Sequence, residues 1–277
     1  MIIYGSEISK KIKAQIKTEL DTYVQKPLLA VILVGNNSAS LSYIKGKEKA
    51  CLEVGINYRL VHLEETTTQA ELIDEINKLN HDDEVNGILL QLPLPKHLDE
   101  RRSLDCIDPN KDVDGLTTAS AGKLYIGQPH FIPCTPLGVM SFFDEVNYDL
   151  SGKNVLIVGR SNLVGLPLMK LLLNSNATVT VAHSKTKNLR ELSKNSDVVV
   201  VAIGRPRFLD DSYFNENAFV IDVGINRVDG KICGDVDFDK VCDKVKYLTP
   251  VPKGVGPLTI ASLIRNTMQA FLEQHHD

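Results

Sequence analysis

The stretch VLIVGRSNLVGLP, residues 155–167, decides the fold of the second half of the chain. An apolar run ends at Gly159, and a helical pattern opens near Val164. A buried strand, a tight glycine turn and a helix together form the unit that binds a dinucleotide pyrophosphate at the helix N-terminus. The usual spacing is GxGxxG, whereas this turn has Ser161 at the second glycine and one extra residue before Gly165. The stretch predicts a nucleotide-binding turn, and a plain strand-to-helix turn is the alternative.

The following strand bears on which dinucleotide would bind. NAD sites usually carry an acidic residue at the end of this strand, which binds the ribose 2′-hydroxyl. Here residues 181–186 contain no acid; Ser184 can donate a hydrogen bond, and Lys185 and Arg160 add positive charge. These side chains suit a 2′-phosphate, so the sequence favours NADP over NAD. The alternative is that Ser184 and Lys185 only cap and solvate a loop.

The whole chain shows two series of alternating strands and helices, which predicts an α/β fold. The second series reads as a Rossmann-like parallel sheet, and the boundary between the two series falls near residue 140. Residues 93–136 show little periodicity and are expected to be irregular. Expected strands are 28–35, 56–63, 87–92, 153–159, 177–183, 196–204 and 218–224, and expected helices are 8–20, 40–53, 69–79, 164–173 and 257–273.

Composition excludes several classes of protein. The 277 residues carry 31 basic and 35 acidic side chains, which argues against a nucleic-acid binder because neutralising phosphates needs a basic surplus. No apolar run approaches the ~18 residues that span a membrane, and no signal-peptide layout is present, so a cytoplasmic protein is expected. The five cysteines are scattered and never form a CxxC pair, so no metal site is expected.

One lysine lies on the apolar face of a predicted helix. Within residues 40–53, Lys47 falls inside the stripe that contains Ile44 and Cys51, and Tyr43 lies one turn earlier on the same face. A buried lysine must pair, have a lowered pKa, or extend its amine to water. The alternative to a functional role is that Lys47 lies at the edge of the stripe and extends its amine to water.

Further polar residues are placed to meet this lysine. Gln91 ends the third strand of the first series, at the sheet edge where ligands bind in open parallel sheets. The segment DPNKDVDG, residues 108–115, then supplies Asp108, Asp112 and Asp114, although an aspartate in such a turn is often only a cap. The sequence allows Lys47, Tyr43, Gln91 and an acid of this segment to converge on one site.

Six motifs stand in order along nearly the whole chain. They are Tyr43-x-x-x-Lys47, Gln91-Leu-Pro-Leu-Pro95, Asp108 to Gly115, Pro133-Cys-Thr-Pro-x-Gly138, Gly159 to Pro167 and Pro250 to Thr259. Each motif is weak alone, but together and in this order they are specific. The chain resembles the bifunctional methylenetetrahydrofolate dehydrogenase/methenyltetrahydrofolate cyclohydrolase family.

This resemblance implies two reactions in one cleft between two βα domains. NADP oxidises 5,10-methylene-tetrahydrofolate to 5,10-methenyl-tetrahydrofolate, and hydrolysis then gives 10-formyl-tetrahydrofolate. The resemblance also implies a discontinuous folate-binding catalytic domain (1–139 plus 257–277), a Rossmann-like NADP-binding domain (140–256) and a homodimer built through the latter.

Carried over residue by residue, the resemblance makes Lys47 the key catalytic group of the hydrolysis. Gln91 would hydrogen-bond Lys47, Tyr43 would form an aromatic wall against the folate, and Asp114 would bind the pterin ring. Further substrate-binding residues would be Leu92, Gly256, Pro257 and Leu258. Cofactor-binding residues would be Thr135, Gly159, Arg160, Ser161, Val164, Gly165, Ser184, Gly204, Ile225 and Thr259.

One departure from the family pattern is visible. The family usually has Gly-Gly where this chain has Lys253-Gly254, and a lysine lacks glycine's freedom at positive φ. Three rival functions are a dehydrogenase without effective cyclohydrolase, a 10-formyl-tetrahydrofolate synthetase, and a non-catalytic NADP-binding module. The synthetase would need an ATP site, and the sequence contains no GxxxxGK[ST] motif.

Overall fold

The computed structural model describes residues 1–275, which form two compact units. Unit 1 comprises Met1–Lys10 and Thr135–Thr259. Unit 2 comprises Lys11–Cys134 and the described residues from Ile260 onward. The helices α1 (Gly5–Leu20), α6 (Cys134–Glu145) and α10 (Val255–His275) each contribute residues to both units.

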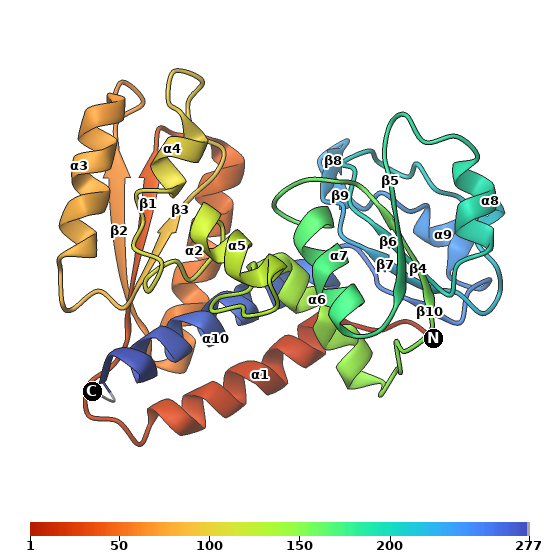
Figure 1. Ribbon diagram of the computed structural model, residues 1–277, viewed down its shortest axis with the longest axis horizontal. Coiled ribbons are helices and arrows are strands. Elements are labelled where there is room, and N and C mark those ends of the chain that lie inside the picture. The colour runs from red at the N-terminus through yellow and green to blue at the C-terminus, as the bar shows by residue number, and fades with distance from the viewer. Residues whose placement is uncertain (276–277) are drawn as a thin grey trace. The chain divides into compact units, whose positions relative to one another are not determined.

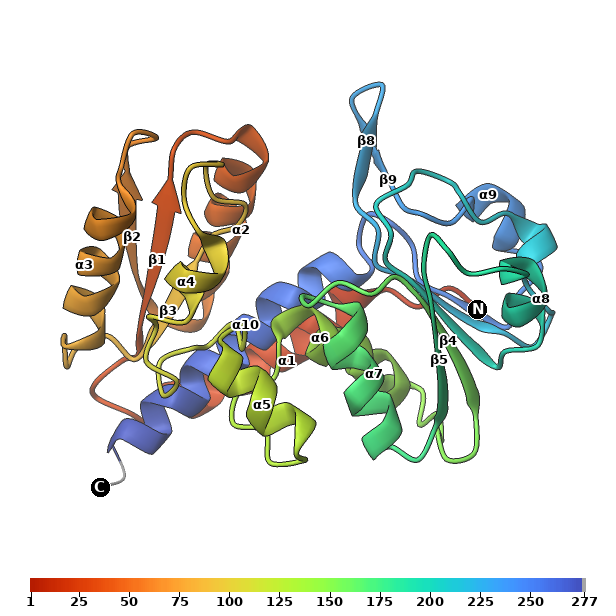
Figure 2. The same ribbon diagram turned by 45° about the horizontal axis from the view of Figure 1, so that its top comes forward.

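Unit 2 is built on a three-stranded parallel sheet with the order β2-β1-β3. Figure 2 shows its helices α2 and α3 on opposite sides of the sheet. Ala30, Ile32 and Val34 of the central strand pack with Leu72 and Ile76 of α3, because alternate residues of a strand face one side. The predicted strand–helix–strand–helix–strand series is confirmed, with β1 (Leu28–Val34), α2 (Ser38–Val54), β2 (Asn57–Leu63), α3 (Gln69–Asn80) and β3 (Gly87–Leu90).

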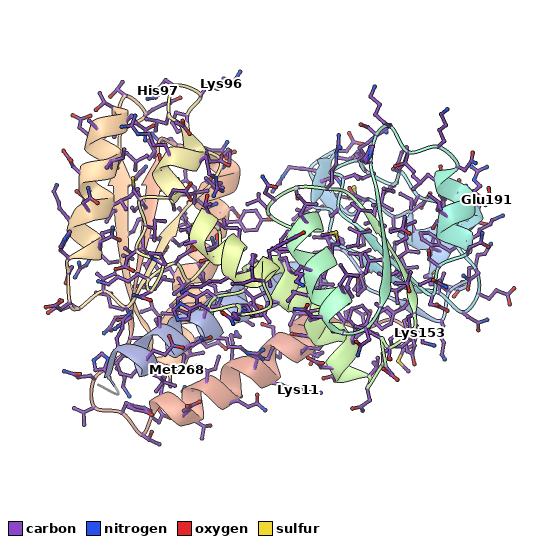
Figure 3. All side chains as sticks on the ribbon, viewed as in Figure 1. Lys11, Lys96, His97, Lys153, Glu191 and Met268 are labelled. Atoms are coloured by element: carbon purple, nitrogen blue, oxygen red, sulfur yellow. The ribbon has the colours of Figure 1, made fainter. Side chains whose placement is uncertain are left out.

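The parts of α1 and α10 that belong to unit 2 also bury apolar side chains. Met268 of α10, labelled in Figure 3, lines a groove with Ile12 and Ile16 of α1. Both helices therefore place an apolar face within this unit, as the periodicity of residues 8–20 and 257–273 predicts.

The expectation that residues 93–136 are irregular is wrong in part. They contain two short helices, α4 (Glu100–Leu104) and α5 (Thr118–Tyr125), and the start of α6. Side chains define where the short helices begin: Asp99 accepts a hydrogen bond from Arg102 N (3.0 Å), and Thr117 Oγ1 accepts one from Ser120 N (3.1 Å). Helices of so few residues are set by their caps and by packing, and they show no extended period in the sequence.

Unit 1 is built on a five-stranded parallel sheet with the order β10-β7-β6-β4-β5. Figure 1 shows α7 on one side of this sheet and α8 and α9 on the other. The four predicted strands (now β4, β5, β6 and β7) and the predicted helix 164–173 (now α7) are confirmed, whereas α8, η1, β8, β9, α9 and β10 were not predicted. The elements are β4 (Asn154–Val158), α7 (Gly165–Asn174), β5 (Thr178–Ala182), α8 (Leu189–Lys194), β6 (Val198–Val201), η1 (Asp211–Tyr213), β7 (Phe219–Asp222), β8 (Asn226–Val228), β9 (Lys231–Cys233), α9 (Phe238–Val241) and β10 (Tyr247–Leu248).

The borders of the compact units differ from the predicted domains at residues 1–10, 135–139 and 257–259. The first residues lie in unit 1 because Ile2 bridges Leu248 and the Ile3 N–H donates to the Leu248 carbonyl (2.9 Å). Pairing with an edge strand is a contact between distant parts of the chain, which the helical period that begins at Ile8 does not reveal.

The departure at Lys253 has a structural consequence that can be measured. Lys253 has φ +79°, and its carbonyl accepts a hydrogen bond from Ser6 N (3.1 Å). Lys253→Gly is expected to raise the free energy of unfolding by about 0.5–1 kcal/mol, because glycine adopts positive φ without strain. Chemical denaturation of this variant measures the change. The matched control is Lys187→Gly, at an exposed lysine without positive φ; an equal loss of stability in both variants would contradict the expectation.

Candidate functional site

Lys47 and Gln91 meet inside unit 2. Lys47, on α2, is only 9% exposed, and its Nζ donates a hydrogen bond to Gln91 Oε1 at 2.9 Å. The Gln91 side-chain amide donates in turn to the Leu92 carbonyl at 2.7 Å, which fixes which side-chain atom of Gln91 faces the lysine. Gln91 directly follows β3, so the pair lies at the carboxyl edge of the sheet, where open parallel sheets bind ligands.

The surroundings of Lys47 favour its neutral amine. Burial lowers the pKa of Lys47, and the negative charge of Asp114 opposes this shift only in part. A lysine with a lowered pKa can accept a proton at a pH where an exposed lysine is already fully charged. Lys45 and Lys49 of the same helix are exposed, so among these three lysines only Lys47 has this environment.

Asp114 lies on a loop that two buried side chains hold in place. Asp112, which is 1% exposed, accepts hydrogen bonds from Leu116 N (3.1 Å), Thr117 N (2.9 Å) and Ser120 Oγ (2.6 Å). From α10, Asn266 Nδ2 donates to the carbonyls of Val113 (2.8 Å) and Ile132 (3.0 Å). Asp114 is thereby fixed from both sides, although its own carboxylate remains half-buried.

Sequence reasoning missed Asn266. It lies on the apolar side of α10 between Ile264 and Met268, and it is 2% exposed. A polar side chain inside an apolar stripe is the signal that drew attention to Lys47, and the same signal could have found Asn266.

Tyr43 and Leu92 remain accessible near the Lys47–Gln91 pair. Tyr43 precedes Lys47 by one turn of α2 and is 40% exposed, and burial of the rest of its ring raises the pKa of its hydroxyl. Leu92 follows Gln91 and is half-buried. An exposed aromatic face one turn from a buried amine is suited to stacking against a flat heterocycle.

In unit 1 the turn between β4 and α7 is closely packed. Gly159 has φ +130°, and a Cβ there would overlap the carbonyl of Ala202. A Cβ on Gly165 would overlap the carbonyl of Gly159, so both positions require glycine. Ser161 Oγ accepts a hydrogen bond from Val164 N (3.2 Å), and α7 begins at Gly165 with no side chain capping its first turn. The Leu166 N–H donates to the Ser161 carbonyl (3.1 Å) and Pro167 has no N–H, so among residues 165–167 the Gly165 N–H is the donor that remains for an anion at this helix start.

The basic and hydroxyl side chains that favour NADP follow the ends of adjacent strands. β4 and β5 pair in parallel up to Val158 and Ala182, and Gly159 N donates to the Ala182 carbonyl at 2.9 Å. Arg160 and Ser184 are therefore at the same edge of the sheet, and both are exposed.

The other predicted residues of unit 1 differ in their accessibility. Thr135 and Thr259 are half-buried with their hydroxyl groups 3.1 Å apart, and Gly256 and Pro257 are also half-buried. Gly204 and Ile225 are exposed. Leu258 is fully buried and packs against Gly138, and its contact with substrate stays a prediction.

Two family models match the chain, one in each half. The model of the tetrahydrofolate dehydrogenase/cyclohydrolase catalytic domain matches residues 3–114, and that of the NAD(P)-binding domain of the same family matches residues 133–275. The chain belongs to the tetrahydrofolate dehydrogenase/cyclohydrolase family. The "Bifunctional protein FolD" of Clostridium beijerinckii is 52% identical over 279 residues, which cover 99% of each chain.

Solved structures of the same family are also similar. The bifunctional FolD methylenetetrahydrofolate dehydrogenase/cyclohydrolase of Campylobacter jejuni has a TM-score of 0.96 and 47% identity, covering 99% of each chain. The Trypanosoma brucei methylenetetrahydrofolate dehydrogenase-cyclohydrolase, solved with NADP cofactor and an inhibitor, has a TM-score of 0.96 and 34% identity, covering 100% of this chain and 99% of that one.

Residues 1–275 contain neither a helix suited to span a membrane nor a cluster of metal-binding side chains. Within this range no helix is both long and apolar enough to cross a membrane. Over the same residues, no group of three or more His, Cys, Asp or Glu side chains could hold a metal ion.

Proposed function

We propose that this chain is a bifunctional enzyme of one-carbon folate metabolism. It oxidises 5,10-methylene-tetrahydrofolate to 5,10-methenyl-tetrahydrofolate with NADP, and it hydrolyses the product to 10-formyl-tetrahydrofolate. The observation that carries the proposal is the buried Lys47–Gln91 hydrogen bond, in a chain 52% identical over its length to a bifunctional relative. In the proposed division, unit 2 supplies the hydrolytic group and unit 1 binds the dinucleotide.

Lys47 handles the proton in the hydrolysis. Water adds to the methenyl carbon, the neutral amine of Lys47 takes a proton from this water, and the bond from the carbon to one ring nitrogen breaks. That nitrogen receives the second proton of the water as the C=O bond forms, and the proton taken by Lys47 is released, so the cationic methenyl compound becomes the neutral formyl compound with loss of one proton. Gln91 accepts a hydrogen bond from Nζ and thereby directs the amine, while Asp114 binds the pterin and Tyr43 stacks against it.

Unit 1 positions the dinucleotide. NADP, when bound, supplies the acceptor for the hydride that leaves the methylene carbon, and no protein acid or base is required for this transfer. The turn at the start of α7, with Gly159, Ser161, Val164 and Gly165, holds the pyrophosphate. Arg160 and Ser184 bind the 2′-phosphate, and the remaining cofactor contacts are assigned to Thr135, Gly204, Ile225 and Thr259.

Removing the positive charge of Arg160 should impair the reaction with NADP much more than the reaction with NAD. Arg160→Ala is expected to lower kcat/KM for NADP by about 10- to 100-fold, because one charge-assisted hydrogen bond contributes about 1.5–3 kcal/mol. The value for NAD, which lacks the phosphate, should change by less than about threefold. Initial rates with each cofactor measure both constants. Arg190→Ala, which removes another exposed arginine of unit 1, is the control, and equal losses with NADP and NAD would contradict the assignment.

A turnover assay tests the proposed function as a whole. The protein is mixed with 5,10-methylene-tetrahydrofolate and either NADP or NAD, and reduced cofactor and 10-formyl-tetrahydrofolate are quantified separately. NADP-dependent reduction with formyl product above the uncatalysed rate is the expected result. Reduction without enzymatic formyl production would leave a dehydrogenase only, and no reduction by the folded protein would leave a non-catalytic NADP-binding module.

We infer a homodimer formed through the nucleotide-binding unit, and a cytoplasmic location, from the family resemblance and the scattered, unpaired cysteines. Sedimentation equilibrium tests the first: a monomer at micromolar concentration would overturn it.

A further inference from the structure

Asp235 is a completely buried carboxylate that accepts four hydrogen bonds. Three come from consecutive backbone N–H groups: those of Ile203 (2.7 Å), Gly204 (3.0 Å) and Arg205 (2.7 Å). The fourth comes from Asn226 Nδ2 at 2.9 Å. Burying a carboxylate is unfavourable unless its oxygens are fully hydrogen-bonded, and here the donors come from two separate loops.

Both loops lie at the carboxyl edge of the five-stranded sheet. Residues 202–205 follow β6, where Ala202 N donates to the Val158 carbonyl at 2.8 Å, and the Ala202 backbone contacts Gly159 of the nucleotide turn. Asn226 begins β8, immediately after the exposed Ile225. Asp235 therefore ties together segments that flank the turn between β4 and α7.

A second buried carboxylate holds Asp235 itself. Asp222, at the end of β7, accepts hydrogen bonds through Oδ1 from Asp235 N (3.0 Å) and Gly224 N (3.0 Å), and through Oδ2 from Val236 N (2.9 Å). Burial raises the pKa of Asp222 to about 7, and the Asp235 carboxylate adds to this rise. A Cβ on Gly224 would overlap Asp235, and one on Gly234 would overlap Asp222, so glycines make room for both carboxylates.

We propose that Asp235 is a positioning residue for the dinucleotide, which holds residues 203–205 in the shape that receives the cofactor. The inference rests on the proposed function of this edge as the NADP site. Asp235 draws three N–H groups of the turn inward, and Gly204, with φ +64° and no side chain, forms the exposed outer surface. A backbone fixed in this way before binding loses less conformational freedom when the cofactor arrives.

The opposite edge of the same sheet offers a contrast. There the side chain of Asp197, the residue before β6, accepts one hydrogen bond, from Asn154 N at 2.8 Å, and Asp197 is half-buried. A carboxylate that joins two strands needs no more than this. The convergence of four donors on Asp235 is found at the edge that carries Gly159 and Arg160.

The test compares Asp235→Asn with Asp197→Asn. The asparagine has the same shape but lacks the charge and presents an NH₂ group to backbone N–H donors. Asp235→Asn is expected to raise the Kd for NADP, measured by calorimetry, by at least about tenfold. Hydrolysis of 5,10-methenyl-tetrahydrofolate without NADP should stay within about twofold, because that reaction uses Lys47. Asp197→Asn should leave both quantities unchanged within about twofold. An equal loss of binding and hydrolysis in Asp235→Asn would indicate a general structural role and overturn the proposal.

Hydrogen exchange in the unaltered protein tests the proposal even if Asp235→Asn does not fold. Without cofactor, the amides of Ile203, Gly204 and Arg205 are expected to exchange at least about 100-fold more slowly than in an unstructured peptide. Exchange as fast as in such a peptide would overturn the positioning role. If the unaltered protein binds NADP and Asp235→Asn binds it equally well, only this inference fails. If the unaltered protein does not bind NADP, the proposed function fails and this inference fails with it.

Discussion

Lys47→Met is expected to lower the rate of 5,10-methenyl-tetrahydrofolate hydrolysis by about 10²- to 10⁴-fold, which is the usual contribution of a positioned acid–base group. Methionine has nearly the length of lysine and is apolar, so it fills the same buried space without the unfavourable burial of an amine. The fold and the affinity for NADP should therefore remain. Stopped-flow measurement of the loss of methenyl absorbance gives the rate, and circular dichroism checks the fold.

Lys45→Met is the matched control for this experiment. Lys45 lies on the same helix two residues earlier and is exposed. Its hydrolysis rate should stay within about twofold of the unaltered protein, because surface substitutions away from a site have small effects. Hydrolysis by Lys47→Met at the unaltered rate would remove Lys47 from the mechanism.

Gly159→Ala is expected to weaken NADP binding by at least about 100-fold, since the turn would have to move to relieve both the overlap and the strain of positive φ. The added methyl group would overlap the carbonyl of Ala202, which belongs to the backbone and cannot rotate away. Hydrolysis of 5,10-methenyl-tetrahydrofolate should persist, because Lys47 and Gln91 lie in the other unit. Calorimetric titration with NADP measures the affinity.

Gly152→Ala separates the effect of overlap from that of strain. Gly152 also has positive φ (+71°), but a Cβ there would meet no atom within 4 Å, and the residue lies before β4 at the opposite edge of the sheet. This variant should lose about 1 kcal/mol of stability and retain the unaltered Kd for NADP. Tight NADP binding by Gly159→Ala would show that the turn is not the pyrophosphate site.

Periodicity predicted the elements that bury a long apolar stripe. The strands at residues 28–35 and 153–159 and the final helix follow from continuous or regularly spaced apolar residues, which leave a signal in the sequence. The helices α4 and α5 leave none, because Asp99 and Thr117 at their starts resemble any polar loop residue. The pairing of Ile2 with Leu248 is equally invisible, since contacts between distant residues have no local pattern.

In the candidate site, too, some residues could be predicted from the sequence and others could not. Lys47 could be found because a charged residue interrupts an apolar stripe, and Gln91 because a polar residue ends a buried strand. The networks around Asp112 and Asp235 could not be found, since both aspartates are in turn-like sequences where capping is the ordinary role. Burial distinguishes these aspartates from ordinary caps, and burial of a loop depends on packing that only the structure gives.

The fate of one labelled carbon distinguishes a bifunctional enzyme from a dehydrogenase without cyclohydrolase activity. 5,10-Methylene-tetrahydrofolate carrying ¹³C at the methylene carbon is incubated with the protein and NADP, and the carbon is followed by NMR. The methylene signal is expected to pass through methenyl to formyl. The second step should be faster than in buffer, and this acceleration should be lost in Lys47→Met. A methenyl signal that accumulates and then decays only at the uncatalysed rate would contradict a bifunctional enzyme.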